Sequence, residues 1–284
     1  MYGMLFTALY DMVDMFWIGM LDKEAVAAVT IYLTLFLALE ILNEVVGTSS
    51  VSLLSRSWGS GDLEMTRRIG EQTFVFKALL GTLGALILIL ILPFFYRLYT
   101  DDAKVLHHGL QYGYLRSIFV PVFFSSYTVN TILRSTGDAK TPMLLLLASA
   151  VLNMILDPIF MFDTIPLTSL KGLGWGMFGA AAATCISYAF AFLAGFWYLQ
   201  SGRAPLTIRV KGLFHLDWAI DKKLLVIGLP SGINMLLRSL ITIIFLKLVA
   251  LYGTVAIAAL GIANRIYQFC GMPSNGLSMG SGIL

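Results

Sequence analysis

The 284-residue chain has few charged residues, few cysteines and few histidines. Asp, Glu, Lys and Arg make up 12% of it, about half the share found in soluble domains, so the chain cannot cover a water-exposed surface of this size. Two cysteines are too few for a disulfide framework, and the net charge of +3 forms no basic stripe for nucleic acid. These shortages exclude a soluble enzyme and a nucleic-acid-binding protein.

The sequence also lacks the residues of ATP hydrolysis and of metal catalysis. The dipeptide Gly-Lys never occurs, so there is no phosphate-binding loop of the G-x-x-x-x-G-K-[ST] type. His107, His108 and His215 do not have the spacing of metal ligands. We therefore expect no cofactor and no enzymatic activity, and any work by the protein has to draw on a gradient or on a partner chain.

Apolar residues are abundant instead, at 58% of the chain with a mean hydropathy of +0.84. A membrane helix needs about 20 mostly apolar residues, and eight such runs follow one another. They predict an all-α membrane protein with about eight transmembrane helices, at residues 1–20, 25–55, 68–96, 104–133, 142–162, 174–200, 223–251 and 254–284. We expect the protein to lie in the lipid bilayer of the plasma (inner) membrane.

The loops between these runs differ in basic residues, which predicts the orientation. The loops after the second, fourth and sixth runs carry ten Lys and Arg residues, whereas those after the odd-numbered runs carry four. Because cytoplasmic loops are enriched in Lys and Arg, we expect the N-terminus and the even-numbered loops to be cytoplasmic.

Two short segments resemble each other and suggest an internal repeat. EAVAAVTI (Glu24–Ile31) and VAIAALGI (Val255–Ile262) share four identities in eight, and each opens an apolar run. A repeat would make one unit six helices long, although chance similarity between Ala-rich segments is the alternative. We expect an N-terminal six-helix lobe at 1–200 with a short first helix, a cytoplasmic interfacial linker at 201–222, and the first two helices of a second lobe at 223–284. A second six-helix unit would need four more helices, so the chain looks truncated.

Four polar residues are predicted to meet inside the membrane. An ionisable group at the centre of a membrane helix costs about 2.5–3.5 kcal/mol, so each one suggests a function. A rise of about 1.5 Å per residue places Asp14, Asn153, Asp157 and Thr184 at similar depths in the outer half, with Asn153 one turn from Asp157. Their oxygens could bind Na⁺ or exchange a proton; the alternative is that Asp14 and Asp157 are structural hydrogen-bond hubs.

Other polar residues in apolar runs are secondary candidates. Glu40 and Glu44 lie one turn apart near the inner end of the second run, where they either line the mouth of a cavity or form a solvated or paired face. Four basic residues lie deep in apolar runs and either pair with the intramembrane acids or contact substrate: Lys77, Arg116, Arg238 and Arg265. The secondary cavity candidates are Tyr10, Asp11, Glu40, Glu44, Asn234, Arg238 and Arg265.

A remote alternative is an intramembrane aspartyl protease. Such enzymes need a Tyr-Asp and a Gly-x-Gly-Asp whose carboxylates face each other and activate water. Both strings occur, as Tyr10-Asp11 and Gly59 to Asp62, but the second lies in a predicted cytoplasmic loop. We therefore expect Asp62 not to meet Asp11.

Several segments are similar to the sequence strings of a known family of membrane proteins. ALYDMVDMFWIG (Ala8–Gly19) is similar to A-L-Y-N-x-V-D-x-x-F-I-G, with Asp11 where Asn is usual. LRSTGDAKTPM (Leu133–Met143) is similar to R-G-x-G-D-T-x-T-P-M. Further similar segments are SLLSRSWGSGDLEMTRR, LNMILDPIF, GAAAATCIS and GLPSGINMLLRS. Together they follow the family's order over most of residues 8–262, so the chain resembles the multidrug and toxic compound extrusion (MATE) family.

The resemblance implies a secondary active exporter that exchanges organic cations, drugs or metabolites for Na⁺ or H⁺ by alternating access between two six-helix lobes. In family members with an N-lobe cation site, the ligands fall on Asp14, Asn153, Asp157 and Thr184. Two features depart from the pattern: Arg238 stands where some members have an essential Glu, and the family normally has twelve helices. The alternative within the superfamily is a flippase for lipids or polysaccharide precursors.

Overall fold

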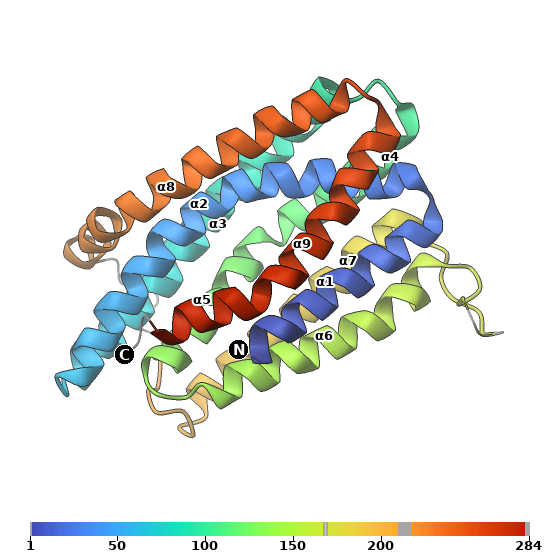
Figure 1. The fold of residues 1–284 in the computed structure, drawn as a ribbon. Coiled ribbons are helices and arrows are strands. Elements are labelled where there is room, and N and C mark those ends of the chain that lie inside the picture. Colours follow the sequence, from blue (N-terminus) through green and yellow to red (C-terminus); the bar gives the residue numbers. More distant parts are fainter. Residues whose placement is uncertain (1, 167, 169, 210–216, 282–284) are drawn as a thin grey trace.

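The computed structural model describes the backbone of residues 2–166, 168, 170–209 and 217–281, and the side chains of residues 12–166, 168, 170–209, 217–268, 270 and 271. This part of the chain is almost entirely helical (Figure 1). The helices are α1 (Tyr2–Leu21), α2 (Lys23–Gly59), α3 (Leu63–Tyr99), α4 (Ala103–Ile118), α5 (Val120–Ser135), α6 (Lys140–Met161), α7 (Gly176–Gln200), α8 (Trp218–Ala250) and α9 (Thr254–Ser281).

One predicted helix is divided in the structure. The run 104–133 forms α4 and α5, which meet at Phe119, a residue with a φ of −86° and a ψ of 0°. Pro121 has no N–H to donate to the carbonyl of Ser117, and its ring crowds the preceding turn, so the helix stops there. The prediction of a single helix was wrong at this point. The other seven runs each form one helix.

The surfaces of the long helices fit a lipid environment. Among the described residues, α2, α3, α6, α7 and α8 are each long and apolar enough to cross a membrane. Leu90 and Phe94 of α3 and Ile241 of α8 are 79%, 72% and 68% exposed. Large apolar patches of this kind are costly in water and stable against acyl chains. The composition-based prediction of an all-α membrane protein is confirmed.

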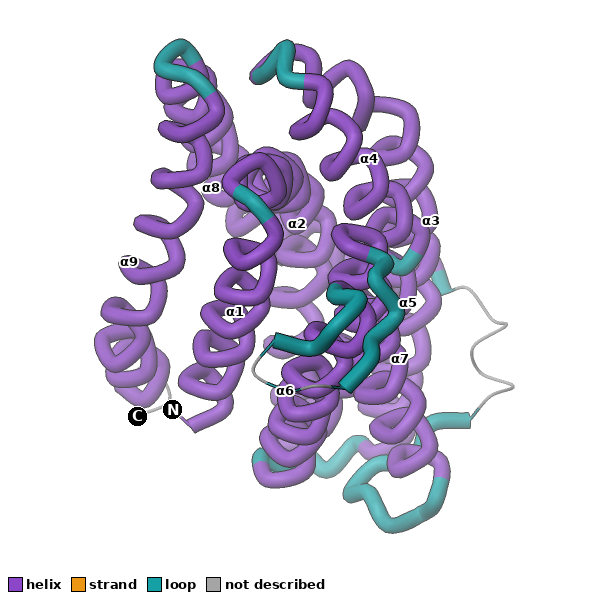
Figure 2. Tube along the Cα trace, turned by 90° about the vertical axis from the view of Figure 1, so that its right-hand side faces the viewer, coloured by secondary structure: helices purple, strands orange, loops and turns teal. Residues whose placement is uncertain are grey.

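The helices form a bundle with α8 and α9 on one side. Helix α7 contacts α4, α5 and α6, while α3 contacts α2, α4 and α5, and α1 lies against α6 (Figure 2). Helix α8 follows α2, and α9 lies against both α1 and α2. Helices α8 and α9 share a turn and diverge away from it (Figure 1). Gly228 permits the close packing of α8 on α2, because a methyl group there would overlap the carbonyl of Val45.

Two of the family-like segments form tight helix-to-helix turns. In the α2–α3 turn, Gly61 has a φ of +77°, and Asp62 accepts a hydrogen bond from the Met65 N–H (2.9 Å) at the start of α3. In the α5–α6 turn, Gly137 has a φ of +92°, and Asp138 accepts a hydrogen bond from the Thr141 N–H (3.0 Å). Both Gly-Asp pairs therefore combine a left-handed glycine with an aspartate that accepts a hydrogen bond from the first turn of the next helix. Asp62 is the N-cap of α3, and Asp138 directly precedes Ala139, the N-cap of α6.

The segment after α7 is attached to α3 by hydrogen bonds. The N–H groups of Arg209 and Asp217 donate to the side chains of Glu71 and Gln72, each at 2.9 Å. Arg67 Nε donates to the carbonyl of Thr207 (3.1 Å). The stretch predicted as an interfacial linker is thus anchored to α3 on both sides of residues 210–216, which lie outside the described residues. The division into two lobes stays a prediction.

Substitution of Asp138 tests the role of the α5–α6 turn. Partial burial acts to raise the pKa of Asp138, but hydrogen bonds from Thr141 and from the Tyr198 hydroxyl (3.2 Å) outweigh it and hold that pKa below its usual value. We expect Asp138→Ala to lower the stability of the purified protein by about 1 kcal/mol, measured by thermal unfolding in detergent.

The pH dependence of this difference follows from the lowered pKa. The stabilisation is fully present above the pKa of an unfolded Asp and is lost as the pH falls through the folded pKa, so the two proteins should converge in acid. Asp101→Ala is the control, because the exposed Asp101 accepts no hydrogen bond from the described residues. A constant difference between wild type and Asp138→Ala at every pH would contradict the assignment.

Candidate functional site

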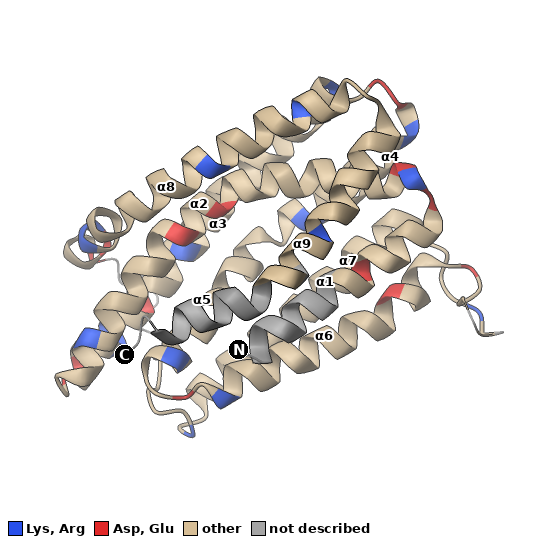
Figure 3. Ribbon diagram, viewed as in Figure 1, with Lys and Arg blue, Asp and Glu red and all other residues tan. Residues whose placement is uncertain are grey.

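The four residues predicted to bind a cation lie in the bundle interior on three neighbouring helices. Asp14 belongs to α1, Asn153 and Asp157 to α6, and Thr184 to α7, and α6 contacts both other helices. Asn153 and Asp157 are fully buried, and Thr184 and Asp14 are 1% and 5% exposed. Figure 3 shows an acidic segment on each of α1 and α6, toward the same end of the bundle.

The contacts of these residues leave acceptor atoms available. Asn153 Nδ2 donates to Asp157 Oδ1 (3.1 Å), as their one-turn spacing predicts. The other oxygens, Asn153 Oδ1 and Asp157 Oδ2, are buried without a hydrogen bond from any described residue. The Thr184 hydroxyl donates its hydrogen to the carbonyl of Ala180 (2.9 Å). Its oxygen keeps two lone pairs that can accept a hydrogen bond or bind a cation. Asp157 also interacts electrostatically with Asp14 and with Arg116.

The donor set of these residues consists of hard oxygen atoms. Carboxylate, amide and hydroxyl oxygens are ligands for hard cations, and a carboxylate can instead carry a proton. Among the described residues, no group of three His, Cys, Asp or Glu side chains is arranged to hold a metal ion. The group thus has the chemistry of a cation site built from oxygen ligands or of a site that carries a proton.

A second polar region lies between α2, α8 and α9. Two cavities of about 330 and 710 Å³ adjoin there, because Leu37, Thr242, Asn264 and Gln268 line both of them. Below we call them together the hollow. Five of the secondary candidates line it: Glu40, Glu44, Asn234, Arg238 and Arg265. The side chains of Tyr10 and Asp11 lie outside the described residues.

The charges of the hollow are spread over its walls. Glu44 of α2 accepts a hydrogen bond from the Thr48 hydroxyl (2.7 Å), and Arg265 of α9 donates to Gln268 (3.4 Å). Behind α2, the buried Lys77 interacts electrostatically with Glu44 and Glu40. The sequence reasoning missed Asn264 and Gln268, whose one-turn spacing in an apolar run is the signal that could have found them.

The end of the bundle at the α8–α9 turn is held together by contacts between distant segments. The Tyr99 hydroxyl donates to the carbonyl of Ile243 (3.1 Å), and Lys247 Nζ donates to the carbonyl of Leu98. The Thr254 hydroxyl donates to Asp102 (3.3 Å). These contacts tie α8 and α9 to the α3–α4 turn at this end of the bundle.

The position of Asp62 contradicts the protease hypothesis. Asp62 is exposed and caps the first turn of α3, at the end of the α2 and α3 helices. An aspartyl protease needs two carboxylates that share a proton inside the membrane. Gly59 to Asp62 is therefore a structural turn, and the alternative is not proposed further.

Comparisons with known proteins agree on one family. The MatE family model matches residues 1–159 and 230–284. The chain is 31% identical to the "Probable multidrug resistance protein YoeA" of Bacillus subtilis (strain 168) over 94% of its length and 56% of that protein. It is 26% identical to the "Multidrug export protein MepA" of Staphylococcus haemolyticus (strain JCSC1435) over 99% of its length and 60% of that protein. The chain thus spans just over half the length of these relatives.

Solved structures of similar fold have related descriptions. The "MATE multidrug transporter DinF-BH", solved in complex with a ligand, matches 96% of this chain and 60% of its own, with a TM-score of 0.87 and 25% identity. An inward-facing "multidrug resistance MATE family transporter of the MOP superfamily" matches 93% of this chain and 58% of its own, with a TM-score of 0.82 and 25% identity.

Isosteric substitutions distinguish two interpretations of Asp14 and Asp157. The two carboxylates either exchange a cation or serve only as structural hydrogen-bond hubs. If Asp14 and Asp157 are kept close together for cation exchange, Asp157→Asn should raise the thermal stability of the cation-free protein, because it removes a buried like charge. Asn153→Asp is the matched variant and should lower it by adding a third acid. Thermal unfolding in detergent without Na⁺ measures both. A fall in stability for Asp157→Asn would instead support the structural-hub interpretation.

Proposed function

This chain belongs to the MatE family, and from that premise we propose that it serves in cation-coupled export of small organic molecules, including drugs or metabolites and in particular organic cations. The observation that carries the proposal is the buried group Asp14, Asn153, Asp157 and Thr184, which lies one helix away from a hollow large enough for a small molecule. The multidrug relatives support this substrate class and do not favour the flippase alternative.

The proposed cation site consists of Asp14, Asn153, Asp157 and Thr184. A bound Na⁺ or a proton would neutralise carboxylate charge there and couple the protein to a gradient, in which each charge crossing 100 mV supplies about 2.3 kcal/mol. Asn153 holds Asp157 Oδ1 through its amide and leaves the second carboxylate oxygen available. The choice between Na⁺ and H⁺ is left open by the proposal, because both use the same oxygens.

Helix α1 connects the proposed cation site to the proposed substrate region. Asp14 interacts electrostatically with Asp157 of α6, whereas the adjacent Met15 lines the hollow beside Thr30 and Arg265. Repulsion between Asp14 and Asp157 acts across the contact of α1 with α6 and weakens once one of the charges is neutralised. A small movement of α1 on α6 would then change the shape of the hollow. In this proposal, that movement couples the two sites during alternating access.

The proposal includes an orientation in the inner membrane. The N-terminus and the even-numbered loops are proposed to be cytoplasmic, from their ten Lys and Arg residues. The end where Tyr99, Lys247 and Thr254 join α8 and α9 to the α3–α4 turn would then face outward.

Ethidium efflux in a pump-deficient bacterial host tests the proposed function. We would compare the 284-residue chain with a form that continues into the C-terminal remainder of YoeA, because the chain spans 56% of that relative. We expect the extended form to expel ethidium and Asp157→Asn to abolish this, since the substitution removes the charge that a coupling cation neutralises.

The control is Asp163→Asn, because Asp163 is an exposed acid in the loop after α6. It should leave efflux unchanged. Membrane insertion of every form is checked by fractionation. If the extended form inserts and neither it nor the short chain expels ethidium, the export proposal is wrong.

A further inference from the structure

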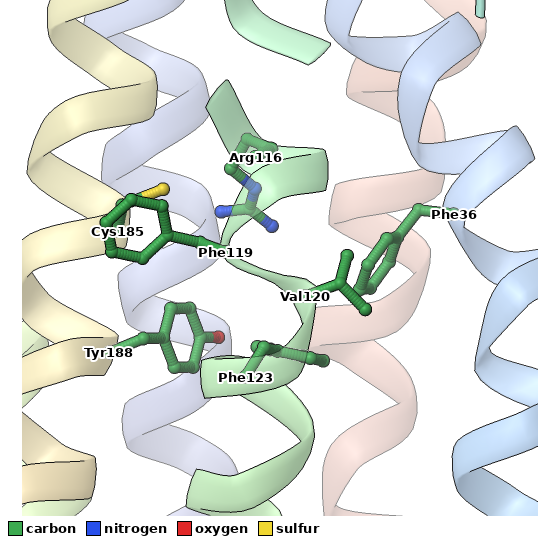
Figure 4. A pocket seen from close by; sticks show the side chains of 7 residues that line it. All are labelled: Phe36, Arg116, Phe119, Val120, Phe123, Cys185 and Tyr188. Carbon is green, nitrogen blue, oxygen red and sulfur yellow. The ribbon is translucent and has the colours of Figure 1, made fainter. Parts of the chain in front are cut away.

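Arg116 and Arg238 both lie in apolar runs, but the protein accommodates their charges differently. Arg116, in the last turn of α4, lines a pocket of only about 10 Å³ among mostly aromatic and apolar side chains (Figure 4). Its guanidinium carbon lies 5.6 Å from the ring centre of Tyr112 and 5.9 Å from that of Phe36. Aromatic faces stabilise a cation at such distances. Because this pocket has no room for a small molecule, the charge of Arg116 is accommodated by the protein itself.

Arg238 of α8 has no such surroundings. It is an exposed residue about 18 Å from the end of α8 at Ala250, and it lines the larger cavity of the hollow, of about 710 Å³. In the described part of the chain, its guanidinium forms no ion pair within 4 Å and lies over no aromatic ring. An arginine at this depth of a membrane helix is costly without a partner, which indicates that a ligand supplies one.

The residues beside Arg238 in the cavity are hydrogen-bond donors. Ser231 and Asn234 lie seven and four residues before it, on the same face of α8, and line the same cavity. Gln268 of α9 also lines it, and Gln268 Oε1 accepts a hydrogen bond from Arg265 (3.4 Å), so the amide N–H groups of Gln268 are left to donate. A guanidinium surrounded by amide and hydroxyl donors suits a carboxylate or another acidic group.

The packing of α8 on α2 sets the levels of the charged residues that they carry. Gly232 lies against Val45, because a methyl group on Gly232 would overlap the Val45 side chain. One turn and a half or more further along α8, the Ser239 hydroxyl donates to the carbonyl of Leu37 (3.3 Å). The two helices therefore run antiparallel in close contact, and the level of each residue on α8 can be related to α2.

Glu44 and Arg238 line the same cavity at different levels. Glu44 directly precedes Val45 and Arg238 directly precedes Ser239, so the two residues lie about 10 Å apart along the bundle. No ion pair within 4 Å joins them. The cavity thus presents one acid and one base that are separated from each other, over a length similar to that of a small organic molecule.

The charged residues of the whole hollow do not add up to a negative site. Its described walls carry Glu40 and Glu44 on α2 against Arg238 and Arg265 on α8 and α9. The buried Lys77 behind α2 adds a further positive charge nearby. A simple cation is attracted by the acids and repelled by the arginines, whereas a molecule with charges of both signs meets an opposite charge at each end.

We propose that the hollow takes small molecules that carry an acidic group as well as a cationic one, with Arg238 binding the acidic group and Glu44 the cationic one. A carboxylate of the ligand would accept two parallel hydrogen bonds from the Arg238 guanidinium, which makes Arg238 the residue that determines specificity. The larger cavity has the size of a ligand pocket, about 300–1,000 Å³. This inference rests on the proposed function and narrows its substrate class to zwitterions.

Binding of three related fluorescent dyes to the purified 284-residue chain in detergent tests the proposal. Rhodamine 6G is a cation, rhodamine 19 is its free acid and carries both charges, and fluorescein carries acidic groups only. Fluorescence polarisation, corrected for protein-free micelles, gives the Kd of each dye. We expect rhodamine 19 to bind most tightly. Arg238→Gln should weaken rhodamine 19 about tenfold or more, because a charge-assisted hydrogen bond is lost, and should not weaken rhodamine 6G.

Further variants separate the charge of Arg238 from its shape. Arg238→Lys keeps the charge and should keep the preference for rhodamine 19 over rhodamine 6G. Glu44→Gln should weaken both rhodamines, because both carry the cationic group. Arg134→Gln is the matched control, since Arg134 is an exposed arginine in the last turn of α5 that lines neither cavity of the hollow, and it should change no Kd. Arg238→Met serves if Arg238→Gln does not fold.

The proposal is overturned if the wild type binds rhodamine 6G more tightly than rhodamine 19, or if the folded Arg238→Gln variant keeps the wild-type preference. It is also overturned if Arg238→Lys loses the preference as fully as Arg238→Gln, because the effect would then come from shape. Each of these results leaves the proposed export function standing, since they concern only the charges of the ligand. Absence of binding of all three dyes to the wild type would count against the hollow as a substrate site and thus against both proposals.

Discussion

The free-energy cost of keeping two carboxylates inside a lipid-embedded bundle governs the rest of this structure. Asp14 and Asp157 are 5% and 0% exposed, and no described ion pair within 4 Å balances Asp157. Buried charge is tolerated only where hydrogen bonds, a countercharge or a bound cation compensates it. Asn153 supplies one hydrogen bond to Asp157. In the proposed function, a bound cation or a proton supplies the rest of the compensation.

In the proposed function, a single helix connects the two acids to the space for substrate. Helix α1 carries Asp14 and contacts α6, and its Met15 lines the hollow, so that a shift of α1 would affect both. Helices α8 and α9 form the far wall of the hollow and are tied to the α3–α4 turn by three hydrogen bonds, two of which involve the charged groups of Lys247 and Asp102. A neutral hydrogen bond contributes about 0.5–1.5 kcal/mol and one to a charged group about 1.5–3 kcal/mol, which is weak enough to break during a conformational change. The linker bonds to Glu71 and Gln72 hold the opposite end of α3.

The order of the helices and the grouping of the buried acids could be predicted, because both depend on local signals. Runs of about 20 apolar residues are unambiguous in a membrane protein, and the contact of Asn153 with Asp157 follows from their one-turn spacing. The break at Phe119 could not be predicted, since Pro93, Pro158 and Pro230 lie inside continuous helices. Asn264 and Gln268 were missed because their position depends on how α8 and α9 diverge.

The central claim is that the Asp157 carboxylate changes its state when the protein exchanges a cation. Infrared difference spectroscopy measures this directly, by comparing the purified chain in Na⁺ with the chain in choline, and the chain at acid pH with the chain at alkaline pH. The account predicts that at least one of these difference spectra contains a carboxyl band that disappears in Asp157→Asn while the backbone bands of the folded helices remain. Spectra with the same carboxyl bands in the wild type and in Asp157→Asn would contradict it.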